Sequence, residues 1–294
     1  MRQILFYAMT EAETFDPSLS LRSLDDITRA GFDAIYLEYR NTRAPRESRR
    51  FQESVQRIVR EAKRRGLGVV LDARIGWFRS ELLVEHPEVF LDRLLPRRVV
   101  TRGGLFTLEL PHGDPSNWTL EGVWRLSDRQ PVKCALESQI SEGGGCAMTR
   151  APAKAKTVQT WRVEGIPEGT LFVVLRERYL YTNMDLGHPV LLPYLDRAAA
   201  LVHEYGADGA AWDEPHFGFD FLDDAYPISE MLYEAFLKRF GYNLRGRLFE
   251  LWEGDGQVRL DFAELLESRL EWLETEFKRR LPGRFVGIHR TMHE

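Results

Sequence analysis

Two hydrophobic patterns alternate along the first 95 residues of the chain. Apolar runs of strand length lie at residues 4–9, 32–39 and 67–72, and such runs between turn signals are typical of buried strands. The segments between them carry apolar residues three or four positions apart, namely Leu24, Ile27 and Ala30, then Phe51, Val55, Ile58, Val59 and Ala62. These stripes predict helices that end at Gly31 and Gly66. The alternation predicts a parallel α/β sheet with right-handed crossovers.

Between about residues 96 and 182 the helical stripes disappear. Short strands separated by Gly, Pro, Asp and Ser clusters take their place, and we expect them at 105–110, 118–126, 132–139, 158–163 and 171–181. This pattern predicts an inserted antiparallel β-sandwich. The glycines at 143–145 are interpreted as a loop, because no helix follows to make a phosphate-binding turn.

The strand–helix pattern returns after residue 182. Apolar residues at helical spacing predict three further helices, marked by Leu191, Leu195, Ala198, Val202 and Tyr205, by Ile228, Leu232, Phe236 and Phe240, and by Phe262, Leu266, Leu273 and Phe277. Strands are predicted at 207–213 and 284–289. The expected organisation is therefore a first part of one domain at 1–95, an insertion at 96–182, and a second part at 183–294.

The resulting fold class is α/β, a (β/α) TIM-type barrel that is incomplete, with about five strands. Five strands do not close an eight-stranded barrel, and residues 1–95 and 183–294 together are fewer than the ~250 of a typical one. The chain is then either the N-terminal part of a longer enzyme or a partial barrel whose open edge needs another subunit. An uncovered edge promotes association, so a homo-oligomer covering it is one expectation.

Composition narrows the classes of partner. The formal net charge is −5, and basic and acidic residues are interspersed, whereas nucleic-acid-binding domains are normally basic. No apolar stretch approaches the ~20 residues of a membrane span, and the N-terminal apolar run is shorter than a secretory signal; a cytoplasmic location is expected. Aromatic residues make up 12% of the chain, compatible with surfaces that stack on sugars. Cys134 and Cys146 could pair across the 143–145 hairpin, but two reduced thiols are expected.

The strongest candidate chemistry lies where the strand at 207–213 ends in Asp213, Glu214 and Pro215. Carboxylates are costly inside a parallel sheet, so they belong at its carboxyl end, where barrel enzymes do their chemistry. Glycoside hydrolysis needs two carboxyl groups, about 5 Å apart for retention or roughly 6.5–9.5 Å for inversion. Glu214 and Glu294, at the ends of neighbouring strands, could supply them. Side chains alternate along a strand, so Asp213 and Glu214 do not both face the pocket. The one that does not could hold a cation or orient Arg74. The alternative interpretation is that Asp213 or Glu214 starts a helical turn before Pro215.

Other strand ends supply candidate substrate-binding residues. These are Glu38, Arg40, Asp72, Arg74, Trp77, His216 and His289. Glu38 and Asp72 could equally be salt-bridge partners of the neighbouring arginines, and Trp77 could stack on a sugar face. His289 and His293 have a spacing that binds metal on a helix, but it is a weaker signal at a strand end.

Several segments resemble the α-L-rhamnosidase type of barrel glycoside hydrolases. Trp212-Asp213-Glu214-Pro215 and the later Gly241-Tyr242-Asn243-Leu244 turn are similar to its fourth-strand region. Residues 163–175 are similar to its β-rich insertion, 183–186 to the return to the barrel, and 285–294 to a fifth strand followed by a histidine and a glutamate. Asn243 stands where that group has Asp, and strands six to eight have no counterpart.

This resemblance implies a calcium-assisted, inverting hydrolase acting on a carbohydrate, with Glu214 and Glu294 as acid and base. Two rival functions stay open. One is a sugar-binding or scaffold protein without turnover. The other is a metal-dependent sugar isomerase or epimerase with His289, Asp213, Glu214 and Glu38 as ligands.

Overall fold

The computed structural model of the chain describes residues 3–39, 48–76, 79–111, 115–142, 156–178, 184–213, 217 and 224–289. They belong to two compact units. The first, here called the parallel unit, comprises Met1–Pro87, Leu186–His216 and Ser268–Glu294. The second, the antiparallel unit, comprises Glu88–Asp185 and Phe217–Glu267. Residues 217–267, which follow the Asp213 strand end in sequence, are thus grouped with the central β-rich segment.

The parallel unit is built on a five-stranded sheet in the order β1-β2-β3-β10-β12. Its strands are β1 (Ile4–Ala8), β2 (Ala34–Glu38), β3 (Gly68–Asp72), β10 (Gly209–Asp213) and β12 (Phe285–His289). All neighbouring pairs are parallel. The five strands predicted from the apolar runs are therefore confirmed, and the chain is an α/β protein in this unit. Strands adjacent in the sheet follow one another in sequence, as repeated strand–helix crossovers produce.

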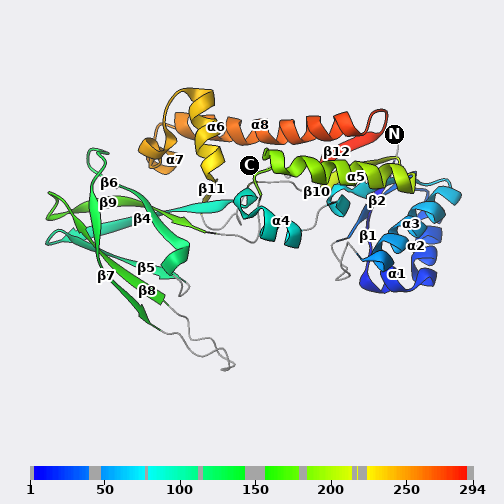
Figure 1. Ribbon diagram of the computed structural model, residues 1–294, viewed down its shortest axis with the longest axis horizontal. Coiled ribbons are helices and arrows are strands. Elements are labelled where there is room, and N and C mark those ends of the chain that lie inside the picture. Colours follow the sequence, from blue (N-terminus) through cyan, green and yellow to red (C-terminus); the bar gives the residue numbers. More distant parts are fainter. Residues whose placement is uncertain are drawn as a thin grey trace. The chain divides into compact units, whose positions relative to one another are not determined.

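Helices cover one face of this sheet. They include α1 (Glu11–Phe15), α2 (Pro17–Arg29), α3 (Arg49–Arg64) and α5 (Leu192–Tyr205), and the first three pack against one another (Figure 1). Strand residues such as Leu37 and Leu71 are completely buried. The ring of Tyr39, just after β2, meets Phe51 of α3 edge-on at 5.3 Å. The odd-numbered positions of β2 therefore face the helices, as period-2 alternation requires.

The start of α1 ties the end of β1 to the helix layer. Thr10 caps the helix in a reciprocal capping box with Glu13, and Tyr7 of β1 donates its hydroxyl to Glu13 Oε1 at 2.7 Å. Burial alone would raise the pKa of Glu13, but hydrogen bonds from Thr10, Tyr7 and Ser23 outweigh it and hold the pKa below its usual range. The same burial and the Glu13 carboxylate raise the pKa of Tyr7.

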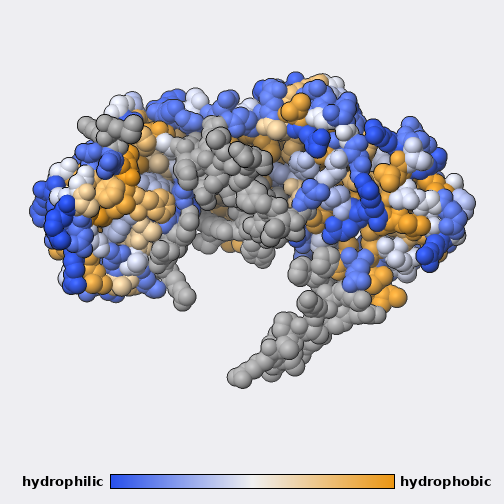
Figure 2. All heavy atoms as spheres, turned by 180° about the vertical axis from the view of Figure 1, so that it is seen from behind, coloured by the Kyte–Doolittle hydropathy of each residue, from blue (hydrophilic) through white to orange (hydrophobic). Residues whose placement is uncertain are grey.

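The opposite face of the sheet, here called the open face, is only partly covered. Register places Phe6, Tyr36, Val70, Gly209 and Phe285 in one row across the five strands. Phe6 and Phe285 are 47% and 48% exposed, although their neighbours in the row are buried. A Cβ on Gly209 would lie 2.0 Å from the Phe285 carbonyl oxygen, so only glycine fits there. Hydrophobic areas interrupt the hydrophilic surface of both units in the view of Figure 2.

The antiparallel unit contains a seven-stranded sheet in the order β6-β9-β4-β5-β8-β7, with β11 also on β4. The strands are β4 (Asp92–Arg102), β5 (Leu105–Pro111), β6 (Trp118–Arg125), β7 (Cys134–Glu142), β8 (Lys156–Val163), β9 (Glu168–Glu177) and β11 (Tyr226–Ile228). The predicted antiparallel strands are confirmed. The two halves, β6-β9-β4 and β5-β8-β7, are joined through the tight β4–β5 hairpin at Arg102 and Leu105.

The coarser prediction, an antiparallel β-rich insertion, is confirmed. The insertion forms one curled sheet, whose inner side encloses a core that includes Leu95, Phe106, Val123 and Val173. The alternation of apolar and polar residues predicts which side chains face inward. It does not reveal whether the two packed halves of a β domain are continuous with each other through a hairpin. Register shifts in β6 and β7 accompany the curl, as bulges do.

Helical segments pack on the outer side of the β6-β9-β4 half. They are α6 (Glu230–Phe240), η5 (Leu244–Arg247), α7 (Glu250–Glu253) and the first part of α8 (Gln257–Arg280). Trp252 lies 5.9 Å from Phe172 and Phe249 lies 5.7 Å from Trp124, measured between ring centroids. Ile228, predicted to begin a helix, ends β11, and α6 starts after the Ser229 cap. None of the helices in the described ranges is both long and apolar enough to span a bilayer.

The remaining helical segments are short. The 3-10 helix η1 (Ala73–Gly76) follows β3, and α4 (Arg79–Glu85) and η2 (Pro87–Val89) lead to the antiparallel unit. η3 (Pro115–Asn117) precedes β6, and η4 (Pro189–Leu191) precedes α5. Cys134 carries a free thiol whose pKa burial raises to about 11; Cys146 lies outside the described residues.

Candidate functional site

The carboxyl ends of three adjacent strands gather acidic side chains in the parallel unit. Glu38 is the last residue of β2, Asp72 of β3 and Asp213 of β10. Their residues are 0%, 0% and 7% exposed. By register, Glu38 and Asp213 lie on the open-face positions of their strands, like Tyr36 and Ala211 before them. Buried carboxylates are retained only with hydrogen-bonding or ionic partners.

Arg74 is the partner of two of these carboxylates. Its Nε lies 2.9 Å from both carboxylate oxygens of Asp72, and its Nη2 donates to Asp72 Oδ2 at 2.6 Å and to Glu38 Oε1 at 2.8 Å. The backbone N–H of Arg74 also donates to Asp72 at 2.9 Å, which fixes the turn of η1. Burial would lower the pKa of Arg74, but Asp72 and Glu38 outweigh it and raise the pKa above its usual range.

This arrangement agrees with the salt-bridge interpretation of Glu38 and Asp72. The Arg74 side chain is 27% exposed, whereas both carboxylates are fully buried. Arg74 is therefore the member of this group of three that solvent reaches. The planar guanidinium of an arginine can donate two parallel hydrogen bonds to a carboxylate and so holds it in one orientation. The three side chains therefore form one rigid group.

Tyr36 reaches the same cluster from the middle of β2. Burial first, and then the negative charge of Asp72, raise its pKa above the usual range, and Asp213 and Glu38 act in the same direction. Its hydroxyl donates to the carbonyl oxygen of Ala211 over 3.4 Å, which is long for an O–H···O bond. Its ring lies 5.3 Å from that of Phe6 at 52°.

A hollow of about 250 Å³ opens on this face of the sheet. It is lined by Ile4, Phe6, Tyr36, Val70, Ala211, Trp212, Asp213, Phe285 and Gly287. The lining is mostly apolar and aromatic, with the Asp213 carboxylate as its acidic group. Concave sites of this character, with a few placed polar groups, are typical of small-ligand sites.

The structure brings four of the sequence-predicted residues together, Glu38, Asp72, Arg74 and Asp213. The backbone of His289 in β12 pairs in register with Asp213, but its side chain lies outside the described residues. The other predicted residues also lie outside them, namely Arg40, Trp77, Glu214, His216 and Glu294. Tyr36 was missed, because a tyrosine inside a buried strand is usually core. Its position two residues before Glu38, on the same face, was the available signal.

The described residues do not fit the calcium ion that the resemblance implies. Ca²⁺ takes six to eight oxygen ligands, mainly carboxylates and carbonyls. Asp72 and Glu38 instead face a guanidinium, whose positive charge opposes a cation at the same place. No group of three or more His, Cys, Asp or Glu side chains suited to a metal occurs within the described ranges.

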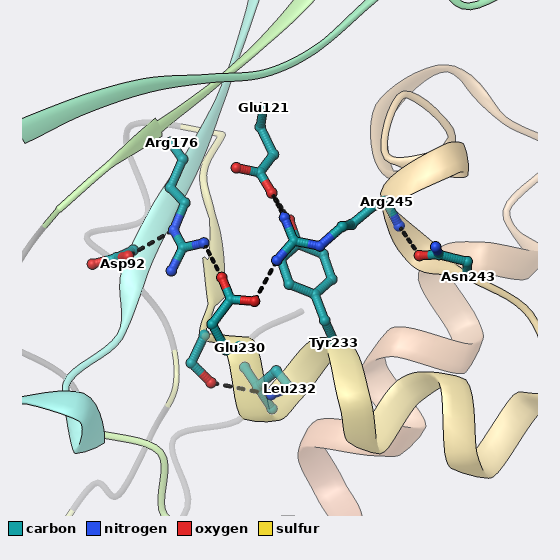
Figure 3. A network of polar contacts seen from close by, with 9 residues as sticks. Asp92, Glu121, Arg176, Glu230, Leu232, Tyr233, Asn243 and Arg245 are labelled. Carbon is teal, nitrogen blue, oxygen red and sulfur yellow. Dashed lines mark hydrogen bonds and ion pairs between the residues drawn. The ribbon is translucent and has the colours of Figure 1, made fainter.

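A second polar cluster holds α6 and η5 on the sheet of the antiparallel unit (Figure 3). Arg176 of β9 bridges Asp92 and Glu230, each at 2.6 Å. Arg245 binds both Glu230 and Glu121, and its guanidinium carbon lies 3.8 Å from the centre of the Tyr233 ring. Tyr233 donates to Glu121 at 2.9 Å.

Each charged group in this second cluster has an opposite partner, and the Glu121 side chain is only 4% exposed. Burial is the larger cause that raises the pKa of Tyr233, and the Glu121 carboxylate adds to it. The cluster joins β4, β6 and β9 to α6 and η5, and we interpret it as structural. It explains why residues 217–267 belong with the antiparallel sheet.

Comparisons with known proteins add no family. No family model matches the chain, and no curated protein matches it. Among solved structures, a Bacillus cereus protein related to NIF3 aligns with 8% sequence identity, over 100% of this chain and 87% of that chain, at a TM-score of 0.14. A likeness at that level carries no argument about fold or function.

Proposed function

We propose that the parallel unit carries the active site of a glycoside hydrolase, with its sheet as part of a (β/α) barrel. The observation that carries the proposal is the cluster of acidic side chains at adjacent strand ends, with Asp213 lining an aromatic hollow. Consecutive parallel strands covered by helices on one face support the barrel, whose carboxyl-end rim is the usual site of chemistry. The resemblance of Trp212-Asp213-Glu214-Pro215 to the α-L-rhamnosidase type supports the same reaction.

The proposed chemistry uses two carboxyl groups. One, protonated, gives its proton to the leaving glycosidic oxygen as the bond from that oxygen to the anomeric carbon breaks. The other, ionised, takes a proton from the water that adds to the anomeric carbon. Glu214 and Glu294 are the leading candidates for acid and base, as the resemblance implies. Asp213, on the open-face position of β10, is the third catalytic candidate.

Arg74 has a supporting role in this proposal. It holds Asp72 and Glu38 in one geometry, so that these carboxylates shape the site from behind rather than contact the reacting bond. The Arg74 side chain is 27% exposed, and its guanidinium would donate to hydroxyl or ring oxygens of a sugar.

The proposal is tested by turnover of a panel of 4-nitrophenyl glycosides. Wild-type protein is expected to release nitrophenol from at least one of them, and Glu214→Gln or Asp213→Asn is expected to reduce kcat by about 10²-fold or more, the scale of a lost general acid or base. Glu53→Gln on α3 is the matched control, because this carboxylate is exposed and lies on the helix-covered side. Full activity of both site variants would reject the assignment.

A second candidate is carbohydrate binding without turnover. The capture of Glu38 and Asp72 by Arg74 favours it, because two of the strand-end carboxylates then serve to hold an arginine. The same panel separates the two functions: saturable binding of a glycoside by folded protein that releases no nitrophenol supports binding alone.

A further inference from the structure

We infer that Tyr36 is a substrate-contacting residue, whose hydroxyl donates to an oxygen of a sugar ring seated in the hollow on the open face. The inference rests on the proposed function in one respect only, that the ligand is a carbohydrate. It names a residue that the acid and base candidates do not include, in the hollow that Asp213 also lines.

The first observation is the poor hydrogen bonding of the Tyr36 hydroxyl. Tyr36 is 9% exposed, yet its described hydrogen bond, to the Ala211 carbonyl, is 3.4 Å long. The hydroxyls of Tyr7, Tyr233 and Tyr242 donate to carboxylates over 2.7, 2.9 and 2.6 Å. A buried donor without a good acceptor is destabilising unless water or a ligand completes it. The Tyr36 hydroxyl can therefore donate to an acceptor on a ligand in the hollow.

The second observation is the position of this hydroxyl. Asp72, Arg74, Asp213 and Glu38 all lie close enough to influence the pKa of its hydroxyl, and burial raises that pKa further above neutral pH, so the phenol stays protonated. A neutral phenol beside carboxylates and a guanidinium can donate to a hydroxyl or ring oxygen without adding charge. Of these groups, Asp213 lines the hollow together with Tyr36.

The third observation is the aromatic wall of the hollow. Phe6 and Phe285 line it and are 47% and 48% exposed. Exposed aromatic residues rimmed by polar groups mark ligand-binding grooves, and the C–H faces of a pyranose pack well on such rings. A volume of about 250 Å³ is below the ~300–1,000 Å³ of pockets for drug-sized ligands. The hollow therefore suits one ring of a glycoside.

The experiment measures sugar binding and turnover on the same variants of the full chain. Saturation-transfer NMR with a mixture of methyl pyranosides of glucose, galactose, mannose and rhamnose identifies the best binder, and calorimetric titration with that glycoside gives its Kd. Tyr36→Phe is expected to weaken binding about tenfold, the scale of one lost hydrogen bond, without lowering Tm. Tyr7→Phe is the matched control: this tyrosine lies on the same sheet, but its hydroxyl binds Glu13 on the helix side. It is expected to lower Tm and leave Kd within twofold.

Equal Kd values for wild type and Tyr36→Phe, binding of none of the pyranosides by wild type, or equal weakening by Tyr7→Phe would overturn the inference. If Tyr36→Phe does not fold, Phe6→Ala decides, because Phe6 is half exposed: weaker binding supports the subsite and unchanged binding overturns it. Binding that depends on Tyr36 without turnover of 4-nitrophenyl glycosides refutes the hydrolase proposal alone. Turnover that Tyr36→Phe leaves unchanged, in kcat and KM, refutes the Tyr36 inference alone.

Discussion

Replacing Arg74 by methionine is the substitution whose effect the structure specifies best. Methionine keeps much of the aliphatic stem but removes the guanidinium that donates to Asp72 and Glu38. Both carboxylates are completely buried in the parallel unit. The variant would remove the Arg74 guanidinium from two buried acidic groups.

The expected cost follows from that burial. Removing one partner of a buried ion pair typically destabilises by about 3–5 kcal/mol, because an uncompensated charge stays inside. The Arg74 side chain is 27% exposed, so solvent screens the pair only in part. For a cooperative unit of ~150–250 residues, 1 kcal/mol corresponds to roughly 2–4 °C in Tm. We therefore expect Arg74→Met to lower Tm by at least ~6 °C.

The assay is thermal and urea unfolding, each followed by tryptophan fluorescence and circular dichroism. The triple variant Arg74→Met/Glu38→Gln/Asp72→Asn is expected to recover most of the loss, because it removes the buried charges as well. Arg49→Met is the control: Arg49 forms an exposed pair with Glu53 on α3, and such pairs contribute little. A midpoint for Arg74→Met equal to that of wild type, or a triple variant less stable than Arg74→Met, would refute the reasoning.

Three further substitutions test other parts of the fold. Gly209→Ala is expected to destabilise the parallel unit severely, since a Cβ there would meet the Phe285 carbonyl oxygen at 2.0 Å; soluble protein with unchanged Tm would contradict the register of β10 and β12. Because the folded pKa of Glu13 is held below its usual value, its contribution is present above about pH 4.3 and is lost as the pH falls further. Glu13→Gln should therefore be less stable than wild type at pH 7, with the two urea midpoints converging toward pH 3; a constant gap would be the contrary result. Arg245→Met should destabilise the antiparallel unit by about 1 kcal/mol, because the nearly buried Glu121 loses its cation, and adding Glu121→Gln should reverse part of this loss in the same unfolding assay.

The sequence predicted the parallel sheet well because its strands are short apolar runs separated by helical stripes. Residues 4–9, 32–39 and 67–72 each contain a strand of the observed sheet, and Gly66 and Gly206 follow α3 and α5 with positive φ, as helix stops. The local pattern of apolar residues suffices to predict such elements, since both their burial and their periodicity depend on neighbouring residues in the sequence.

Long-range packing was not predictable in the same way. The grouping of residues 217–267 with the antiparallel sheet depends on ion pairs such as Arg176–Glu230, which join positions 54 residues apart. Charged residues of this kind look like ordinary surface residues in a sequence. The continuous curled sheet was missed for a similar reason, because a single hairpin at Arg102 and Leu105 joins its halves.

The candidate site was predicted in part. Strand-end position identified Glu38, Asp72 and Asp213, because carboxylates are tolerated at that end of a buried parallel strand. Which of these carboxylates Arg74 binds depends on side-chain geometry around η1, so the sequence alone did not predict it. Tyr36 was missed because its ring packs like that of a core residue. Only the hydrogen bonding of its hydroxyl distinguishes it, and the sequence does not show that.

The central claim is that a sugar binds in the hollow on the open face of the parallel sheet, which Asp213 and Tyr36 line. A crystal structure of the protein with its best-binding methyl pyranoside tests this most directly. The account predicts ligand density beside Asp213 and Tyr36, within hydrogen-bonding distance of the Tyr36 hydroxyl. Density for the sugar on the antiparallel unit, with the hollow occupied by solvent alone, would contradict it.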